Sequence, residues 1–209
     1  MPPFSEPHRV AAAELAARDE TIARLADRFG LPTFPPPTES AFAALVRAIT
    51  HQQLSNRSAE AIRGRLLVAL GGDITAAGLL ALPETGLREV GMSQAKILSL
   101  RDLARRVEEG ALVLDRAALV EQDDETVTAA LTAVRGVGRW TAEMFLLFQL
   151  SRLDVWPTGD LSIRKGYAAG WDVAVPTATE LDVLGEAYRP YRSVAAWYCW
   201  AVLGQAPGA

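Results

Sequence analysis

Cysteine is nearly absent from this 209-residue sequence, in which Cys199 is the single example. A disulfide framework is therefore excluded, and so is a zinc or iron–sulfur site held by several cysteines of one chain. Histidine is almost as scarce, with only His8 and His51. Two isolated histidines are too few for a catalytic triad or a divalent-metal site, so we expect a protein that requires no cofactor.

Long apolar runs are missing as well. No uninterrupted apolar stretch is long enough to span a bilayer. Residues 1–6 lack the basic segment and the apolar run of a signal peptide. The sequence therefore predicts a cytoplasmic protein without a membrane partner.

Strand-forming segments and excess positive charge are also lacking. Runs rich in Val, Ile, Thr and Tyr are scarce, whereas Ala, Leu, Arg and Glu dominate, which predicts an all-α fold. The net charge is −4, and the pI is about 5.3. This balance counts against a nucleic-acid partner, because such proteins usually carry a basic footprint. It does not exclude one, because a local phosphate site needs only a few cationic or backbone donors.

Glycine, proline and N-cap residues divide the chain into predicted helices. These helices are expected over residues 9–29, 38–49, 56–70, 93–110 and 124–134, with short helices within 73–91. The expected N-caps of the second, fourth and fifth of them are Thr38, Ser93 and Asp124.

A glycine-rich interruption marks the most informative segment. Residues 135–138, Arg-Gly-Val-Gly, break a helical pattern that resumes at once with Trp140 and Met144. Two helices joined by such a turn form a hairpin, in which glycine permits positive φ and a close approach of the backbone. The amides that begin the second helix are left unpaired, which suits a phosphate. On this motif alone, a tight turn without a ligand is the commoner outcome.

A longer pattern surrounds this hairpin. Residues 131–142 (LTAVRGVGRWTA) are followed, after one helix, by residues 154–164 (DVWPTGDLSIR). Together they resemble the hairpin, the Gly/Pro-rich loop and the catalytic aspartate of the helix-hairpin-helix DNA glycosylases, and most closely the 3-methyladenine DNA glycosylase II group. The likeness extends upstream to residues 47–55 and downstream to 188–200, so it covers about residues 40–204 in the family's order.

The resemblance implies a two-lobed helical fold with the active site in the cleft between the lobes. Residues 41–151 would form the lobe that contains the hairpin, and residues 1–40 together with 152–209 would form the other. Longer members of the group carry an N-terminal α/β domain, whereas this chain has one predicted helix and a connector in that place. We therefore expect a short, all-helical form that acts as a monomer.

The function implied is hydrolysis of the N-glycosidic bond of alkylated purines in double-stranded DNA, with the damaged base flipped out of the duplex. Asp160 corresponds to the catalytic carboxylate, which stabilises charge developing on the sugar and orients or deprotonates water. We expect Asp160 in the first turn of a helix capped by Thr158. Trp140 stands where bifunctional relatives carry a nucleophilic lysine, so a monofunctional enzyme without lyase activity is expected.

Aromatic side chains are the expected walls of the base pocket. By family position these are Trp140 and Trp200, with Met144 one helical turn after Trp140. Their π faces suit a flipped base, and a cationic base most of all. The residue that fills the gap left by the flipped base is either Gln53 or Leu54.

Contacts to the DNA backbone are expected at two places. The amides of Gly136 and Gly138, with the hydroxyl of Thr141, form the first phosphate site. Ser93 and Lys96, at the start of a helix, form a second one, although a solvated surface lysine explains Lys96 equally well.

The resemblance implies two further features near these contacts. A monovalent cation, Na⁺ or K⁺, would be held by the main-chain carbonyls of Thr132, Val134 and Val137 and would bridge the hairpin to a phosphate. His51, next to the two glutamines at 52 and 53, is predicted to touch the minor groove.

Simpler interpretations remain open at this stage. Trp156 and Trp171 are expected to fill the core. A non-enzymatic DNA-binding module would use the hairpin for phosphate alone, but it would need neither Asp160 nor the pair of Trp140 and Trp200. A glycosylase for a neutral lesion, such as uracil, is the third alternative.

Overall fold

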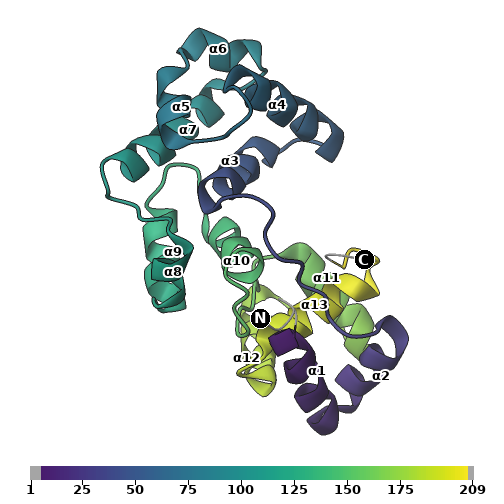
Figure 1. Cartoon of the computed structure of the whole chain (residues 1–209). Helices are drawn as coiled ribbons and strands as arrows, with labels where there is room; N and C mark the ends of the chain where they lie inside the picture. The colour runs from purple at the N-terminus through teal and green to yellow at the C-terminus, as the bar shows by residue number, and fades with distance from the viewer. Residues whose placement is uncertain (1–5, 207–209) are drawn as a thin grey trace. The chain divides into compact units, whose positions relative to one another are not determined.

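The structure, a computed structural model, describes residues 6–206, and no strand occurs in that range (Figure 1). The helices are α1 (Glu6–Arg18), α2 (Glu20–Phe29), α3 (Ala41–His51), α4 (Asn56–Ala69), α5 (Ala76–Ala81), α6 (Glu84–Glu89), α7 (Gln94–Glu108), α8 (Arg116–Val120), α9 (Asp124–Thr132), α10 (Arg139–Phe148), α11 (Leu161–Trp171), α12 (Ala178–Gly185), the 3₁₀ helix η1 (Glu186–Tyr188) and α13 (Arg192–Val202). The all-α prediction is confirmed.

The chain divides into two compact units. Thr38–Phe145 form one, here called the hairpin unit, and residues 6–37 with 146–206 form the other, here called the terminal unit. The second division lies within α10, between Phe145 and Leu146. None of the helices in the described range is both long and apolar enough to cross a membrane.

The terminal unit is built around the contact between α11 and α13. Gly166 of α11 lies so near α13 that a Cβ placed on it would be 2.0 Å from the main-chain oxygen of Cys199. Next to this contact lies a group of aromatic side chains, in which Tyr167 stacks on Trp171 with ring centroids 4.4 Å apart. Trp156 is buried, and its indole nitrogen donates to Leu181 O at 2.8 Å. Trp156 therefore lies in the core as expected, while Trp171 is half-buried at its edge.

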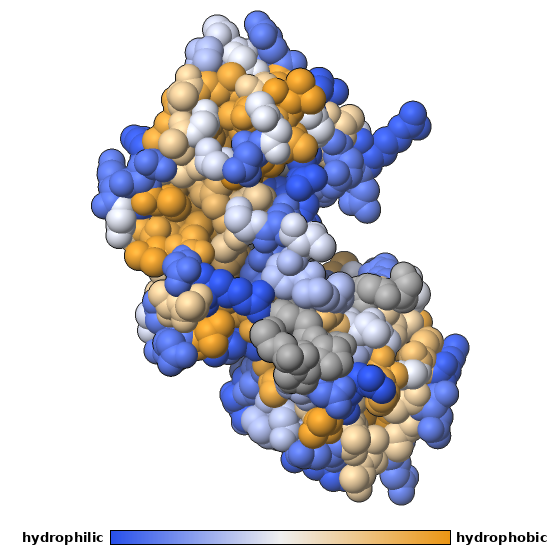
Figure 2. Space-filling model, in the orientation of Figure 1, coloured by the Kyte–Doolittle hydropathy of each residue, from blue (hydrophilic) through white to orange (hydrophobic). Residues whose placement is uncertain are grey.

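In the hairpin unit, α7 is the central helix. It packs against α3, α5 and α6, and α3 also packs against α4. Leu100 and Leu103 of α7 are fully buried in this core. Large apolar side chains also reach the surface, and Figure 2 shows apolar surface over the α5–α7 region at the top of the view. More than half of a folded protein's accessible surface is apolar, so exposed apolar residues do not by themselves indicate a binding site.

Several helix boundaries differ from the sequence-based expectations. The single helix over 9–29 is wrong: the chain breaks at Asp19, whose carboxylate caps α2 by accepting from Ile22 N at 2.8 Å. Thr38 is not the cap of α3, because Ser40 Oγ accepts from Ala43 N at 3.1 Å. Asp123, not Asp124, caps α9 in the same way. In each case the N-cap side chain accepts from the main-chain amide three residues further along and so satisfies one free amide of the first helical turn.

Other predicted helices of the hairpin unit are confirmed, with one exception. Ser93 caps α7, as expected, and the short helices within 73–91 appear as α5 and α6. The predicted helix over 56–70 is α4. The short helix α8 (Arg116–Val120) was not expected.

Candidate functional site

Asp160 is the N-cap of α11. Its backbone is extended, with φ −76° and ψ 118°, and its Oδ1 accepts from Ser162 N at 2.7 Å. Thr158, the expected cap, lies in the preceding turn, where its amide donates to Trp156 O at 2.9 Å and Asp160 N donates to Pro157 O at 3.0 Å. The chain is still turning at residue 158, so the helix can begin only after Asp160. The carboxylate is thereby placed at the positive end of the helix dipole.

The loop that leads to Asp160 is anchored to the start of α13. Arg192 binds Asp154 through two contacts, Nε to Oδ1 at 2.8 Å and Nη2 to Oδ2 at 2.9 Å, and Arg189 Nη1 lies 2.7 Å from Asp154 Oδ2. Ser193 Oγ donates to Arg152 O at 2.6 Å. Paired contacts of this kind between arginine and carboxylate fix orientation as well as distance. Both segments, residues 154–164 and 188–200, were singled out in the sequence, but the pairing of Asp154 with Arg189 and Arg192 was not predicted.

Trp200, on α13, is almost fully buried, with 6% of its surface exposed. Its ring centroid lies 6.0 Å from that of Phe148, and Phe148 lies 6.2 Å from Phe34. Phe34 in turn stacks on His8 at 3.9 Å. Trp200 therefore ends a column of rings within the terminal unit.

Asp160 and α13 also interact electrostatically. Burial raises the pKa of the Cys199 thiol, and the negative charge of Asp160 raises it further. Cys199 precedes Trp200 on α13, so the candidate carboxylate and one candidate pocket wall belong to the same unit and to neighbouring parts of it. Trp140 belongs to the hairpin unit and is considered there.

The hairpin turn lies between α9 and α10. Gly136 has φ +77°, and a Cβ there would be 2.5 Å from Ser99 Oγ, so both positive φ and close approach require glycine. Gly138 does not have positive φ. The expected positive φ of the hairpin glycines therefore holds for Gly136 only.

The hairpin turn also exposes main-chain donors. The first hydrogen bond of α10 runs from Ala142 N to Gly138 O at 3.1 Å. Within residues 6–206, the amides of Gly136, Gly138 and Thr141 donate no hydrogen bond to the chain. Gly136 and Gly138 are exposed, whereas Thr141 is buried, so Thr141 is less accessible than the two glycines.

Trp140 is the most exposed aromatic residue at the hairpin, with half of its surface accessible, and Met144, one turn further along α10, is half-buried. An indole left open to solvent forgoes much of the free energy that burial would give it. The i, i+4 spacing directs Trp140 and Met144 toward the same side of α10. This geometry suits a surface that a planar base can cover.

The α3–α4 turn carries the residues expected to fill the gap. Gln53 has φ +57° and is exposed, and Leu54 is 38% exposed. His51, the last residue of α3, has Nδ1 2.9 Å from Arg47 O and Nε2 3.1 Å from Glu60 Oε1. His51 is thus held by its own unit through both ring nitrogens.

A pocket of about 440 Å³ lies beside the hairpin turn. It is lined by Gln52, Gln53, Ser93, Ala95, Lys96, Ser99, Arg135 and Gly136. Ser93 Oγ accepts from Lys96 N at 3.4 Å as the cap of α7, and Lys96 Nζ donates to Thr50 O at 2.7 Å. Burial lowers the pKa of Lys96. Ser93 and Lys96, the residues predicted to contact a second phosphate, thus line the same pocket as Gly136, and one donor of Lys96 is already used.

The three carbonyls expected to hold a cation fit that role in part. Val134 O accepts from Val137 N at 3.1 Å. The carbonyls of Thr132 and Val137 accept no hydrogen bond from any part of the chain that the structure describes. Unpaired carbonyl oxygens around one tight turn are suitable ligands for Na⁺ or K⁺.

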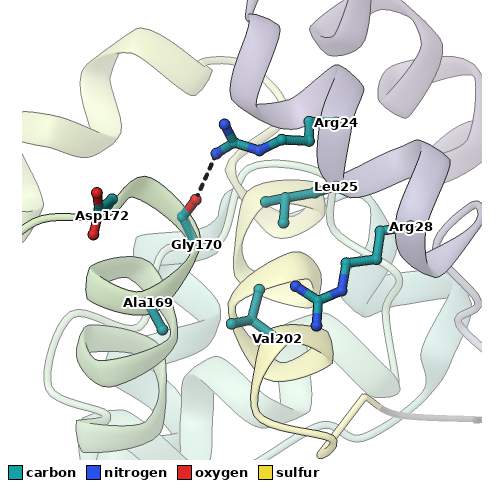
Figure 3. Close-up of a pocket in the computed structure, with 7 residues that line it drawn as sticks. All are labelled: Arg24, Leu25, Arg28, Ala169, Gly170, Asp172 and Val202. Carbon is teal, nitrogen blue, oxygen red and sulfur yellow. Dashed lines mark hydrogen bonds between the residues drawn. The ribbon is translucent and has the colours of Figure 1, made fainter.

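A second pocket, of about 300 Å³, lies in the terminal unit at the far end of α11 (Figure 3). Arg24 donates to Gly170 O there at 3.0 Å, and Arg28 also lines the pocket. An α-helix rises about 1.5 Å per residue, so the 11 residues of α11 separate this pocket from Asp160 by about 16 Å. This pocket is therefore not part of the candidate catalytic site.

Comparison with known proteins identifies the family. The family model described as HhH-GPD superfamily base excision DNA repair protein matches residues 46–180. The chain belongs to this superfamily. Its similarity to DNA-3-methyladenine glycosylase 1 of Schizosaccharomyces pombe is 33% identity over 200 residues, covering 91% of the chain and 85% of that protein.

Two solved structures of the superfamily agree with this assignment. A DNA-3-methyladenine glycosidase from Bacillus halodurans is 33% identical, with a TM-score of 0.85 over 93% of this chain and 89% of that one. The 3-methyladenine DNA glycosylase of S. pombe in complex with abasic DNA is 32% identical, with a TM-score of 0.77 over 91% of this chain and 94% of that one. The HhH-GPD fold expected from the sequence is confirmed.

Proposed function

We propose that this HhH-GPD protein is a monofunctional DNA glycosylase that removes alkylated purines, such as 3-methyladenine and 7-methylguanine, from double-stranded DNA. The observation that carries the proposal is Asp160, a half-buried carboxylate held at the N-cap of α11 by Ser162 N. The names of the relatives, three of which refer to 3-methyladenine, agree with it.

The chemistry assigns Asp160 an electrostatic role. As the bond from C1′ to the base nitrogen breaks, its electron pair goes to the departing base, and the sugar becomes an oxocarbenium-like cation. A fixed carboxylate stabilises that cation and orients the water whose oxygen then bonds to C1′. The water proton passes to Asp160 or to solvent, and an alkylated cationic purine leaves as a neutral base.

The expected base-contacting aromatics suit cationic bases. Trp140 is half-exposed on α10, whereas Trp200, which ends the aromatic column of the terminal unit, has 6% of its surface exposed. Aromatic faces attract a cation through their quadrupole, whereas a neutral lesion needs specific donors that protonate or hydrogen-bond the leaving base. We expect a broad, charge-selective pocket that recognises little of the base edge.

The absence of lyase activity is inferred from the lysines. The sequence holds two, Lys96 and Lys165. Lys96 Nζ donates to Thr50 O, and Lys165 is exposed on α11 five residues after Asp160. Trp140 occupies the position at which bifunctional relatives carry the lysine nucleophile, and an indole cannot form a Schiff base.

DNA would be held chiefly by main-chain groups. The amides of Gly136 and Gly138 are free to donate to one phosphate, and Ser93 and Lys96 lie beside a second candidate position. Na⁺ or K⁺ bound by the carbonyls of Thr132, Val134 and Val137 would add positive charge at the hairpin. The protein is proposed to act as a monomer on damaged duplex DNA.

The deciding experiment compares two aspartates of the same helix. Asp160→Asn removes the charge at the N-cap of α11, while Asp172→Asn removes one at its C-cap, where Asp172 is exposed with φ 56°. Release of free bases is measured from methylated and from uracil-containing duplexes. We expect Asp160→Asn to abolish release and to retain DNA binding, and Asp172→Asn to retain both.

Two results would contradict the proposal. Near-normal release by Asp160→Asn would remove the carboxylate from the mechanism. Faster release of uracil than of 3-methyladenine by the unsubstituted protein would overturn the alkylpurine assignment, although the enzyme class would stand.

A further inference from the structure

The α3–α4 turn is held in an uncommon backbone conformation. Gln53 has φ +57°, in the left-handed region that residues other than glycine rarely adopt. Such a conformation persists only where surrounding contacts fix it. The turn also exposes Leu54, so it presents to solvent the two side chains that are candidates to fill the gap left by a flipped base.

Two long side chains, one from the turn itself and one from α7, tie this turn to other parts of the hairpin unit. Gln52, the C-cap of α3, donates from Nε2 to Gly136 O at 2.8 Å. Lys96 Nζ, from the first turn of α7, donates to Thr50 O at 2.7 Å. The first contact spans 84 residues of sequence and ends on the glycine of the hairpin turn that has positive φ.

The chemistry of the Gln52 contact is unambiguous. A carbonyl oxygen can only accept, so the contact requires the amide NH₂ of Gln52 as donor. Methionine has nearly the same length and volume but no donor. The substitution Gln52→Met therefore removes this hydrogen bond with little change in shape.

We propose that Gln52 is a positioning residue. It fixes the α3–α4 turn, which carries Gln53 and Leu54, relative to the phosphate-binding hairpin turn. Phosphate contacts fix where a protein sits along a duplex. The side chain that enters the gap must then reach one particular base step. Gln52 joins the carbonyl of Gly136, beside the phosphate-binding amides, to the residue preceding Gln53, so it couples the two. This inference rests on the proposed function.

The test compares Gln52→Met with Gln205→Met, a substitution of an exposed glutamine after α13. For both variants and the unsubstituted protein, dissociation constants are measured for an undamaged duplex and for the same duplex with one abasic site. Single-turnover release of 3-methyladenine and thermal unfolding are measured in parallel. The unfolding midpoint shows whether the fold is retained.

We expect Gln52→Met to bind undamaged DNA as the unsubstituted protein does, since the hairpin amides remain. Its preference for the abasic duplex and its rate of base release should each fall about three- to tenfold, the range for loss of one hydrogen bond. Gln205→Met should change neither.

Three results would overturn the inference. They are an unchanged abasic preference in Gln52→Met, a parallel loss of affinity for both duplexes, and no abasic preference in the unsubstituted protein. Failure of the proposed function gives a different result: the unsubstituted protein would prefer the abasic duplex without releasing 3-methyladenine, and the binding measurements would still decide the role of Gln52.

Discussion

Gly166 is the position at which one added methyl group should do most damage. A Cβ there would lie 2.0 Å from Cys199 O, 2.5 Å from its carbonyl carbon and 2.8 Å from its Cα. These are backbone atoms of α13, so no side-chain rotation can relieve the contact. The two helices would have to separate by about 1 Å to reach even the shortest tolerated distance of 3.0 Å.

The cost of Gly166→Ala follows from that separation. Overpacking a filled core typically costs about 1–3 kcal/mol, and a clash with rigid backbone on both sides belongs at or above the upper limit. We expect the free energy of unfolding to fall by about 3 kcal/mol or more. In a chain of this length that lowers the unfolding midpoint by about 6–12 °C. Asp160 begins α11 and Trp200 lies on α13, so base release by the folded fraction should fall too.

The matched control is Gly64→Ala, on an exposed face of α4. No atom outside its own helix lies within 4 Å of a Cβ at that position. Alanine is better than glycine inside a helix by about 0.5–1 kcal/mol, so this variant should be slightly more stable. Urea denaturation of both variants at pH 7 measures the two effects. If Gly166→Ala unfolds within 0.5 kcal/mol of the unsubstituted chain, the inferred backbone contact between α11 and α13 is wrong.

Three further predictions follow from other parts of the chain. Borohydride should trap no covalent adduct with DNA, because Trp140 replaces the nucleophilic lysine, and a trapped adduct that disappears in Lys165→Ala would contradict this. Base release should survive EDTA, since residues 6–206 contain no group of three His, Cys, Asp or Glu side chains placed to hold a metal ion, and loss that zinc or magnesium restores would show otherwise. Burial lowers the pKa of His8 to about 4, so the unfolded chain takes up the proton first as the pH falls below 6.5. The free energy of unfolding should then drop by about 2 kcal/mol at pH 5 and about 3 kcal/mol at pH 4. Calorimetry of His8→Phe should show a shallower decline of stability between pH 6.5 and pH 4. Equal slopes for the variant and the unsubstituted protein would refute this prediction.

Local sequence signals predicted much of the hairpin unit. The cap at Ser93 and the glycine turn before α10 depend on residues adjacent in sequence, and both appear where expected. Errors of one or two residues arose where two cap-forming residues stand close together. At the start of α11, Thr158 and Asp160 are both good N-caps, and only the turn made by Pro157 places the helix after Asp160.

Contacts between distant segments could not be predicted from one sequence. The pairing of Asp154 with Arg192 anchors the loop before Asp160, yet neither residue indicates its partner. Lys96 has an ordinary surface sequence context, and only the fold shows that its amine reaches Thr50 O. The need for glycine at 166 is likewise invisible in a helix, because it arises from α13.

The acidic net charge counts against DNA binding, and the placement of the arginines does not offset it. Arg47 and Arg63 both contact Glu39, and Arg192 contacts Asp154, so these arginines are already paired with carboxylates. The hairpin offers DNA mainly main-chain amides, which carry no net charge of their own. Counterion release scales with the number of phosphates that cationic side chains neutralise. The acidic net charge therefore limits the part of the DNA affinity that comes from counterion release. Hydrogen bonding by the hairpin amides does not depend on net charge.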